Sequence, residues 1–457
     1  MNILVIGGSG PLGGYTALHL QSEGHEVTIS SRRKPAAHSP LSALKWVKGN
    51  YLEESFSRDD LTNYDAIVFA AGSDPRHVPE GADPDEHFLH ANGVMVPKFA
   101  ELARSAGVKN FIHIGSFYGH VLPGYIETNP YVRSRHLAAK RVCDLSTDSF
   151  RALSLDAPFV VGVPGGMKDA MWMAYMSYAR GLYPEIPVGG PAGGTNFISV
   201  RTLAQAVSGA LASGTGGKAY LLGDENLSFS DFFAYFFKAV GNPANVTAID
   251  GEHPMLPDIA IMQGRGNFID YQPDPADVKQ LGYARKDVGP FITEMIADLD
   301  KIIGDFTPID LGTGAGFDPE LRALADSYCR AVDRADKSAL RDLFTQDAVL
   351  KGPGFRHDGI EEILTIADVL PTMFLKTRHV TTGQIVEING KTAKGETLCT
   401  ASHLKIPGPG EQANEMIEWQ IRYQDQFIKQ NGKWRIKHRA LILDWIEVRN
   451  VHTLTRT

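Results

Sequence analysis

Three glycines near the N-terminus have the type and spacing needed to hold a phosphate-bearing ligand. Gly8, Gly10 and Gly13 form a G-x-G-x-x-G pattern between the apolar run 2–6 and a segment with helical periodicity. In this strand–turn–helix setting the backbone can approach a pyrophosphate, and the N–H groups and dipole at the start of the helix stabilise the anion. We therefore predict a dinucleotide site lined by the turn residues Gly7, Gly8, Ser9, Gly10, Pro11, Leu12 and Gly13.

Two arginines indicate which dinucleotide binds. Arg32 and Arg33 follow the predicted strand 26–30, where a dinucleotide-binding fold otherwise offers an acidic residue to the ribose 2′-hydroxyl. A guanidinium fork there suits a 2′-phosphate, so we predict NADP as the cofactor, with NAD as the alternative. An exposed basic loop without a cofactor role would have the same composition.

Strands and helices alternate through the first two thirds of the chain. This alternation predicts an α/β Rossmann fold, with a doubly wound parallel sheet. The predicted strands are 2–6, 26–30, 44–48, 66–70, 110–115, 151–153 and 158–161, and the predicted helices are 11–23, 92–106 and 131–143.

The first 305 residues resemble the extended short-chain dehydrogenase/reductase family, which includes the nucleotide-sugar epimerases and dehydratases. The resemblance rests on the glycine turn and on segments 64–72, 92–94, 108–116 and 196–204. It implies a small substrate lobe beside the sheet. It also implies further cofactor contacts from Ala70, Ala71, Gly72 and Asn92.

The same resemblance implies a catalytic centre. Ser116 falls where the family has a Ser that orients the substrate carbonyl, and Tyr131 falls on the Tyr that acts as acid and base. The family has a Lys four residues after that Tyr, whereas this chain has Arg135. Arginine keeps the positive charge but does not titrate usefully. A domain that binds a nucleotide without redox chemistry is therefore an alternative, as is Tyr118 in place of Tyr131.

An apolar segment, 167–183, follows in the region of the implied substrate lobe. Its stripe of methionine and aromatic side chains predicts either core packing or contact with a large apolar substrate. The stripe comprises Met171, Trp172, Met173, Tyr175, Met176 and Tyr178.

The pattern changes after the glycine-rich segment 306–318, which we interpret as a linker between domains 1–305 and 319–457. Amphipathic helices are predicted at 319–332 and 337–344. Strands are predicted at 348–351, 378–388, 392–405, 416–429 and 433–446, and Asn431-Gly432 predicts a hairpin turn between the last two. Helices followed by an antiparallel meander indicate an α+β cone.

This last third resembles the SnoaL-like branch of the nuclear transport factor 2 superfamily, and within it the scytalone dehydratase and bile-acid dehydratase group. The resemblance rests on segments 328–336, 343–348, 377–381 and 434–439. It places Asp333 and His379 on an Asp–His catalytic pair and His403 on a second catalytic His. It also places Tyr328 on a catalytic Tyr and Arg439 on an Arg that closes the site.

An Asp–His pair is suited to proton abstraction because the carboxylate fixes the imidazole tautomer and stabilises the protonated ring. His403 or Tyr328 could then protonate a leaving hydroxyl. A binding site without chemistry and a dimerisation module are the alternatives, because a histidine in a strand is more often a satisfied polar residue.

Composition narrows the choice of partners. The formal net charge of −8, with no long basic run, disfavours nucleic acid and anionic membranes. The three cysteines have no paired spacing, which favours a reducing cytoplasm. The sequence has no run of about 18 apolar residues, so we predict no membrane span. We expect no metal, a small-molecule partner and a homodimer.

Taken together, the two resemblances predict a bifunctional enzyme. One domain would be an NADP-linked oxidoreductase, and the other a dehydratase (a lyase) acting on an apolar cyclic hydroxy-ketone such as a polyketide, a steroid or an aromatic catabolite. The alternatives are a redox-inactive nucleotide sensor with a ligand-binding or dimerising module, and a sugar-nucleotide epimerase.

Overall fold

The structure, a computed structural model, describes residues 1–452 except 38, 75–77, 305, 307–308 and 408–413. The chain divides into two compact units. The first comprises Met1–Trp172 and Val188–Leu299, and the second comprises Met173–Pro187 and Asp300–Thr457. Among the described residues, no helix combines the length and the apolar character that crossing a membrane requires.

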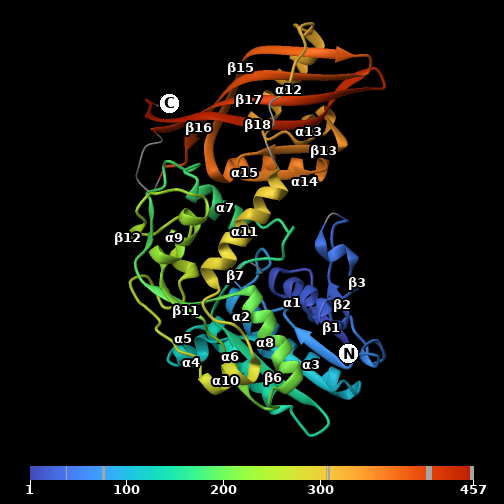
Figure 1. The fold of residues 1–457 in the computed structure, drawn as a ribbon, viewed down its shortest axis with the longest axis vertical. Coiled ribbons are helices and arrows are strands. Elements are labelled where there is room, and N and C mark those ends of the chain that lie inside the picture. The colour runs from blue at the N-terminus through green and yellow to red at the C-terminus, as the bar shows by residue number, and fades with distance from the viewer. Residues whose placement is uncertain (38, 75–77, 305, 307–308, 408–413, 453–457) are drawn as a thin grey trace. The chain divides into compact units, whose positions relative to one another are not determined.

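A seven-stranded sheet forms the centre of the first unit, in the order β10-β6-β5-β4-β1-β2-β3, and all its strand pairs are parallel (Figure 1). The Rossmann prediction is therefore confirmed. The strands are β1 (Asn2–Ile6), β2 (Glu26–Ser31), β3 (Lys45–Lys48), β4 (Ala66–Phe69), β5 (Asn110–Ser116), β6 (Arg151–Ala157) and β10 (Ala219–Leu221).

Helices cover both faces of this sheet because its strands are apolar on both sides. Ile3 and Val5 of β1 pack into one core with α1 (Pro11–Ser22) and α8 (Val200–Ser213). Leu4 and Ile6 pack into the other core with α3 (Val96–Ser105) and α6 (Pro130–Asp144). The remaining helices of the unit include α2 (Pro84–Phe88), α4 (Tyr118–Val121), α5 (Tyr125–Thr128), α9 (Phe229–Ala239) and α10 (Pro275–Leu281). Two more helices, α7 (Ala170–Ala179) and α11 (Val288–Ile303), run from the first unit into the second.

Two details differ from the sequence-based expectation. The predicted helix 92–106 is divided into a π-helix, Leu89–Met95, and α3. The predicted strand 158–161 is β7 (Phe159–Val161), which lies outside the main sheet. It pairs with β9 (Gly194–Ser199) in a small sheet that also contains β11 (Glu225–Ser228). Pro158 separates β6 from β7, and proline has no N–H to continue the ladder. A further pair is β8 (Gly189–Pro191) with β12 (Thr247–Ile249).

The second unit contains a six-stranded mixed sheet in the order β14-β13-β18-β17-β16-β15. Its strands are β13 (Phe344–Gly352), β14 (Phe355–Asp358), β15 (Phe374–Asn389), β16 (Thr392–Lys405), β17 (Glu415–Gln430) and β18 (Lys433–Asn450). The hairpin at Asn431-Gly432 is confirmed, because both residues have the positive φ that a tight turn between β17 and β18 requires (52° and 79°).

Helix α12 (Pro319–Asp333) packs against β15 and β18 and closes a hydrophobic core over the sheet. Three shorter helices complete the unit, namely α13 (Lys337–Leu343), α14 (Ile360–Leu364) and α15 (Ile366–Met373). The sequence predicted α12 and α13 but missed α14 and α15. The separate α+β fold of this part of the chain is confirmed.

Candidate functional site

The glycine turn between β1 and α1 leaves no room for side chains. A Cβ on Gly13 would lie 2.4 Å from the carbonyl oxygen of Gly7, and one on Gly8 would lie 2.6 Å from Ile29. Gly7 has φ +77° and abuts the backbone of Ala70 and Ala71 after β4. These contacts bring the turn and the end of β4 together, as a dinucleotide crevice requires.

The start of α1 is free to bind an anion. Its N-cap is Gly10, which supplies no side-chain hydrogen bond, and its first residue is Pro11. Because no protein side chain caps the first turn, its backbone N–H groups can serve a ligand. The geometry therefore fits the pyrophosphate of a dinucleotide.

Arg135 of α6 reaches the same edge of the sheet. Its Nη2 donates to the carbonyl oxygen of Ile114 in β5 (2.7 Å), and a Cβ on Gly72 would lie 1.9 Å from its Nη1. The side chain is buried, its Nε has no partner, and no carboxylate of the described residues pairs with it. An unpaired buried guanidinium calls for an oxygen-rich or anionic ligand.

The arginines after β2 are exposed. Arg32 lies close enough to Tyr51 to act on it electrostatically, as does Arg135. Burial raises the pKa of Tyr51 to about 12, against the opposing positive charges of Arg135 and Arg32. Positive charge therefore gathers where the sequence predicts the cofactor, which suits a phosphorylated ligand.

Ser116, Tyr131 and Tyr118 lie on neighbouring elements. Ser116 is the last residue of β5, and Tyr131 lies in the first turn of α6, where Asn129 caps the helix by accepting from the N–H of Val132 (3.1 Å). Tyr118 begins α4. Burial raises its pKa, and the nearby Tyr131 raises it further. Tyr118 therefore keeps its hydroxyl protonated, and the choice between Tyr131 and Tyr118 as acid and base stays a prediction.

Asn92 links two elements of the crevice. Its side chain is fully buried in the π-helix and accepts from the N–H of Ser73 (2.9 Å). Its amide nitrogen donates to the carbonyl oxygen of Ser73 (3.0 Å) and to Oγ of Ser134 (3.1 Å). This amide positions the loop after β4 against α6, and its predicted contact with the cofactor stays a prediction.

In the second unit, Asp333 and His379 form a direct pair. Asp333 ends α12, and its Oδ1 lies 2.7 Å from Nδ1 of His379 in β15. The backbone N–H of His379 and the hydroxyl of Thr377 also donate to this carboxylate, each at 2.9 Å. Burial alone would raise the pKa of Asp333, but the hydrogen bonds from His379 and Thr377 lower it below its usual value. The pairing leaves Nε2 of His379 for a substrate.

His403 stands beside this pair. Its ring lies 5.6 Å from that of His379 at nearly a right angle, and it also contacts Phe374 (4.6 Å) and Trp419 (5.6 Å). Burial and the neighbouring His379 lower the pKa of His403 to about 4. The ring is therefore neutral near pH 7, and the predicted catalytic role of His403 stays a prediction.

Arg439 forms a fully buried ion pair. Its Nε and Nη2 donate to the two oxygens of Asp425, each at 2.7 Å, and neither side chain is exposed. The guanidinium packs against the rings of both Tyr328 and Tyr423, 4.2 Å from each centroid. Burial raises the pKa of Tyr328, which keeps its hydroxyl protonated.

Family models match both parts of the chain. Residues 3–223 match the NAD dependent epimerase/dehydratase family, and residues 319–440 match the SnoaL-like domain. The chain joins an epimerase/dehydratase-family domain to a SnoaL-like domain.

Individual relatives agree with this assignment for the epimerase-family domain. A UDP-glucose 4-epimerase of Klebsiella pneumoniae is 29% identical over 128 residues, which are 25% of this chain and 89% of that protein. The enzyme WbmH of Bordetella bronchiseptica, solved with NAD+, has a TM-score of 0.50 at 15% identity, over 65% of this chain and 98% of its own. A UDP-glucose-4-epimerase of Stenotrophomonas maltophila, solved with NAD and formylated UDP-arabinopyranose, has a TM-score of 0.50 at 19% identity, over 65% and 96%. The two structures show a shared fold.

The apolar stripe of 167–183 is core. Trp172, Met173, Tyr175, Met176 and Tyr178 are all buried, and Trp172 stacks on Phe236. These side chains are occupied by protein packing, so they offer no argument for an apolar substrate.

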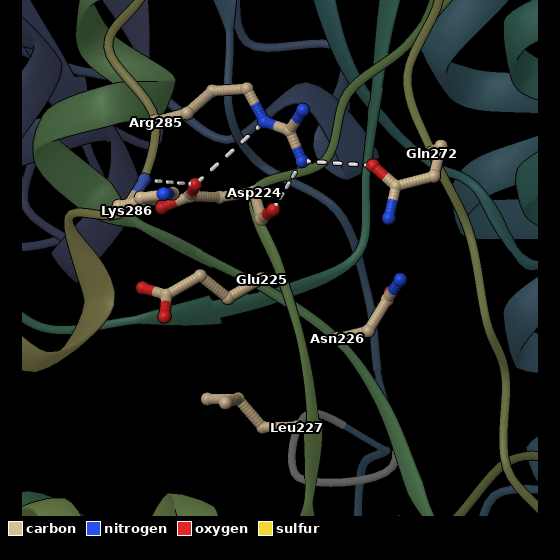
Figure 2. Close-up of a pocket in the computed structure, with 7 residues that line it drawn as sticks. All are labelled: Asp224, Glu225, Asn226, Leu227, Gln272, Arg285 and Lys286. Atoms are coloured by element: carbon tan, nitrogen blue, oxygen red, sulfur yellow. Dashed lines mark hydrogen bonds and ion pairs between the residues drawn. The ribbon is translucent and has the colours of Figure 1, made fainter.

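A cavity of about 480 Å³ lies in the first unit, at the carboxyl end of β10 (Figure 2). The buried carboxylate of Asp224 accepts from the backbone N–H groups of Lys286 and Asp287, and Arg285 bonds to Gln272 (3.1 Å). None of the predicted site residues lines it. Its lining residues are Asp224, Glu225, Asn226, Leu227, Gln272, Arg285 and Lys286.

Sequence reasoning missed Asp425 and Tyr423. Both alternate with Phe427 on the buried face of β17, and Asp425 stands directly opposite Arg439 in the β17–β18 register. The sequence places the carboxylate of Asp425 at an inward position of a strand. This position could have predicted a buried ion pair, because a carboxylate is seldom buried without a cationic partner. Among the described residues, no group of three or more His, Cys, Asp or Glu side chains could hold a metal ion.

Proposed function

We propose that the chain is a bifunctional enzyme, an NADP-linked oxidoreductase joined to a dehydratase that acts on a cyclic hydroxy-ketone. The observation that carries the proposal is the 2.7 Å contact between Asp333 and His379 beside His403. An oriented histidine with a free Nε2 is the group that abstracts a proton next to a carbonyl.

In the SnoaL-like domain, His379 takes the α-proton at Nε2, and the C–H electrons form the new C=C bond as the β-hydroxyl leaves. Asp333 stabilises the protonated imidazole and holds its tautomer. Tyr328, protonated and next to the positive charge of Arg439, gives a proton to the departing hydroxyl so that water is released. Neutral His403 does not serve as the acid.

In the epimerase-family domain, the glycine turn, Arg135 and the loop after β4 would hold the cofactor, and Arg32 with Arg33 would bind its 2′-phosphate. A bound nicotinamide dinucleotide supplies or accepts a hydride. Ser116 orients the carbonyl oxygen, and the hydroxyl of Tyr131 gives or takes its proton.

Arg135 contributes a fixed positive charge that favours the Tyr131 phenolate. Because its guanidinium does not titrate, it takes no part in a proton relay. The predicted homodimer and cytoplasmic location remain predictions.

Sugar-nucleotide epimerisation is a second candidate. It is favoured by the 29% identity to a UDP-glucose 4-epimerase, over 25% of this chain. It would leave the Asp333–His379 pair without a role, because epimerisation needs only the epimerase-family domain.

Titration of the full-length protein with NADPH and NADH, followed by nicotinamide fluorescence, tests the first half of the proposal. We expect tighter binding of NADPH and a loss of that preference when Arg32 and Arg33 are both changed to Ala. Equal binding of the two cofactors would contradict the role of the arginines. Absence of any binding would contradict the redox assignment and favour a domain without redox chemistry.

Dehydration of cyclic β-hydroxy-ketones, followed by the ultraviolet absorbance of the enone product, tests the second half. We expect His379→Ala to reduce the rate by about 10²–10⁴-fold and to spare dinucleotide binding. Arg378→Ala, on the exposed side of the same strand, is the matched control and should keep the rate. Dehydration that survives in His379→Ala refutes the dyad, and interconversion of UDP-glucose and UDP-galactose without dehydration supports the second candidate.

A further inference from the structure

Two of the chain's three cysteines meet in the core of the SnoaL-like domain. Cys329 lies in α12 and Cys399 in β16, and their thiols share a hydrogen bond. Both residues are buried, at 4% and 3% exposed, and both are free cysteines. Direct contact between two sulfur atoms is the first requirement of a disulfide. We call Cys329 and Cys399 the thiol pair and ask whether it is a site of oxidation.

The surroundings of the thiol pair favour a thiolate. The hydrogen bond with Cys329 lowers the pKa of Cys399, while burial opposes the shift. His379, Tyr423 and Arg439 lower the pKa of Cys399 further. The same hydrogen bond raises the pKa of Cys329, so the first proton leaves the pair readily and the second is held. The thiolate is the form of cysteine that reacts with oxidants.

The third cysteine shows what burial does to a thiol without such neighbours. Cys143 lies in α6 of the first unit, where burial, with the negative charge of Asp156, raises the pKa of its thiol to about 12. A buried thiol of this kind is inert. Cys143 is therefore a matched control for the thiol pair within the same chain.

The thiol pair lies next to both members of the Asp333–His379 pair. Cys329 and Asp333 are four residues apart on α12, so their side chains lie on the same face of the helix. Cys399 stands opposite Thr381 in the β15–β16 register, and Thr381 lies two residues after His379 on the same side of β15. The side chain of Asp333 is 21% exposed, so the thiol pair lies one helical turn from a solvent-accessible group.

We propose that Cys329 and Cys399 form a reversible disulfide that separates Asp333 from His379. The thiolate of Cys399 attacks one oxygen of hydrogen peroxide, the O–O bond breaks, and the departing hydroxide takes up a proton, which leaves a sulfenic acid. Cys329 loses its proton and attacks this sulfur, so that the S–S bond forms and hydroxide leaves with that proton as water. The two thiols are oxidised, and the peroxide is reduced to two molecules of water.

The disulfide changes the position of Asp333. Because bonded sulfur atoms lie closer together than hydrogen-bonded thiols, the new bond draws the last turn of α12 towards β16. Asp333 moves with that turn while His379 stays on β15, so the 2.7 Å contact between them is lost. The imidazole then loses the carboxylate that fixes its tautomer. The resulting loss of dehydration rests on the proposed function, whereas formation of the disulfide does not.

Treatment of the full-length protein with hydrogen peroxide tests the disulfide without any need for turnover. Remaining thiols are alkylated as the protein unfolds, and mass spectrometry of its peptides locates each modified cysteine. We expect a disulfide between Cys329 and Cys399 with Cys143 left free, and recovery of all three thiols in dithiothreitol. Three free thiols after treatment, a bond that includes Cys143, or sulfonic acids without a cross-link would overturn the inference.

Two variants identify the role of each cysteine. Cys329→Ser removes the thiol that closes the bond, so Cys399 should stop at the sulfenic acid, which dimedone traps. Cys399→Ser removes the thiol that reacts first, so Cys329 should stay reduced, and dimedone on Cys329 would contradict the order of the two steps. Cys143→Ser should form the disulfide as the wild type does. The peptide map of the wild type decides the inference even where a serine in the core prevents folding.

Proton NMR of the imidazole N–H groups follows the Asp333–His379 contact directly. An N–H that donates to a carboxylate resonates far downfield, and His379→Ala identifies the signal of His379. We expect this signal in the reduced protein, its loss after oxidation and its return in dithiothreitol. A signal that persists in the cross-linked protein would refute the displacement of Asp333.

Dehydration assays separate the thiol pair from the proposed function. The oxidised wild type should dehydrate cyclic β-hydroxy-ketones about tenfold or more slowly than the reduced wild type, and Cys329→Ser should show no such loss. A disulfide that forms without slowing dehydration refutes the switch alone. A protein that forms the disulfide, loses the His379 signal and never dehydrates a hydroxy-ketone in either state refutes the proposed function alone.

Discussion

Replacing His403 with phenylalanine is expected to make the SnoaL-like domain more resistant to mild acid. The folded protein holds this ring neutral because burial and the neighbouring His379 lower its pKa from 6.5 to about 4. The unfolded chain carries no such constraint, so its ring takes up a proton at an ordinary pH. Folding stability therefore depends on pH through this residue.

The sign and size follow from the two pKa values. Above pH 6.5 the ring is neutral in both states, so its titration does not lower the free energy of unfolding. As the pH falls from 6.5 to about 4, only the unfolded state binds the proton, so the free energy of unfolding decreases. The full shift corresponds to about 3 kcal/mol, and below about pH 4 the penalty stays constant.

The effect of Asp333 falls in a different window. Its pKa is lowered from 3.8, so its contribution to stability is present above that value and is lost only as the pH falls through the lower folded value. Of His403 and Asp333, only His403 therefore changes the free energy of unfolding between pH 6.5 and about 4.

Urea unfolding at a series of pH values, followed by tryptophan fluorescence, measures the difference between wild type and His403→Phe. Three tryptophans, Trp419, Trp434 and Trp445, report on the SnoaL-like domain. Groups that do not interact with His403 cancel in the difference. His90→Phe, at an exposed position of the other domain, should keep the wild-type dependence. A difference that stays constant between pH 6.5 and 4 would refute the neutral His403.

Two further variants test packing and the dinucleotide turn. Asp425→Asn should lower the free energy of unfolding by about 3–5 kcal/mol because it leaves Arg439 buried without a counter-charge, whereas Asp444→Asn, in a solvent-exposed pair, should cost less than about 1 kcal/mol. Equal losses in the two unfolding curves would contradict the burial argument. Gly13→Ala should weaken dinucleotide binding by about tenfold or more, since its Cβ would lie 2.4 Å from a backbone oxygen of the turn. Gly124→Ala meets nothing within 4 Å and should bind as wild type in the same fluorescence titration, and undiminished binding by Gly13→Ala would refute the close approach.

Local features of the chain could be predicted because neighbouring residues determine them. The glycines of the turn, the Asn431-Gly432 hairpin and the alternation of strands and helices each express a backbone preference over a few residues. The resemblances to the two families were confirmed for the same reason, since their motifs are short and continuous. The helix predicted at 92–106 was only partly right, because the buried hydrogen bonds of Asn92 to Ser73 and Ser134 accompany a π-helix there.

Partnerships between distant residues were decided by the tertiary structure alone. The sequence placed Asp333 and His379 together only through a family resemblance, whereas the fold brings α12 and β15 into contact and sets the 2.7 Å pair. Asp425 could not be assigned to Arg439, because a register between strands is a property of the whole sheet. Burial likewise depends on every neighbour, and burial is what leaves His403 neutral. The sequence by itself determined which chemical groups and local turns the protein has, and the packing determined which of those groups meet and which protonation state each of them holds.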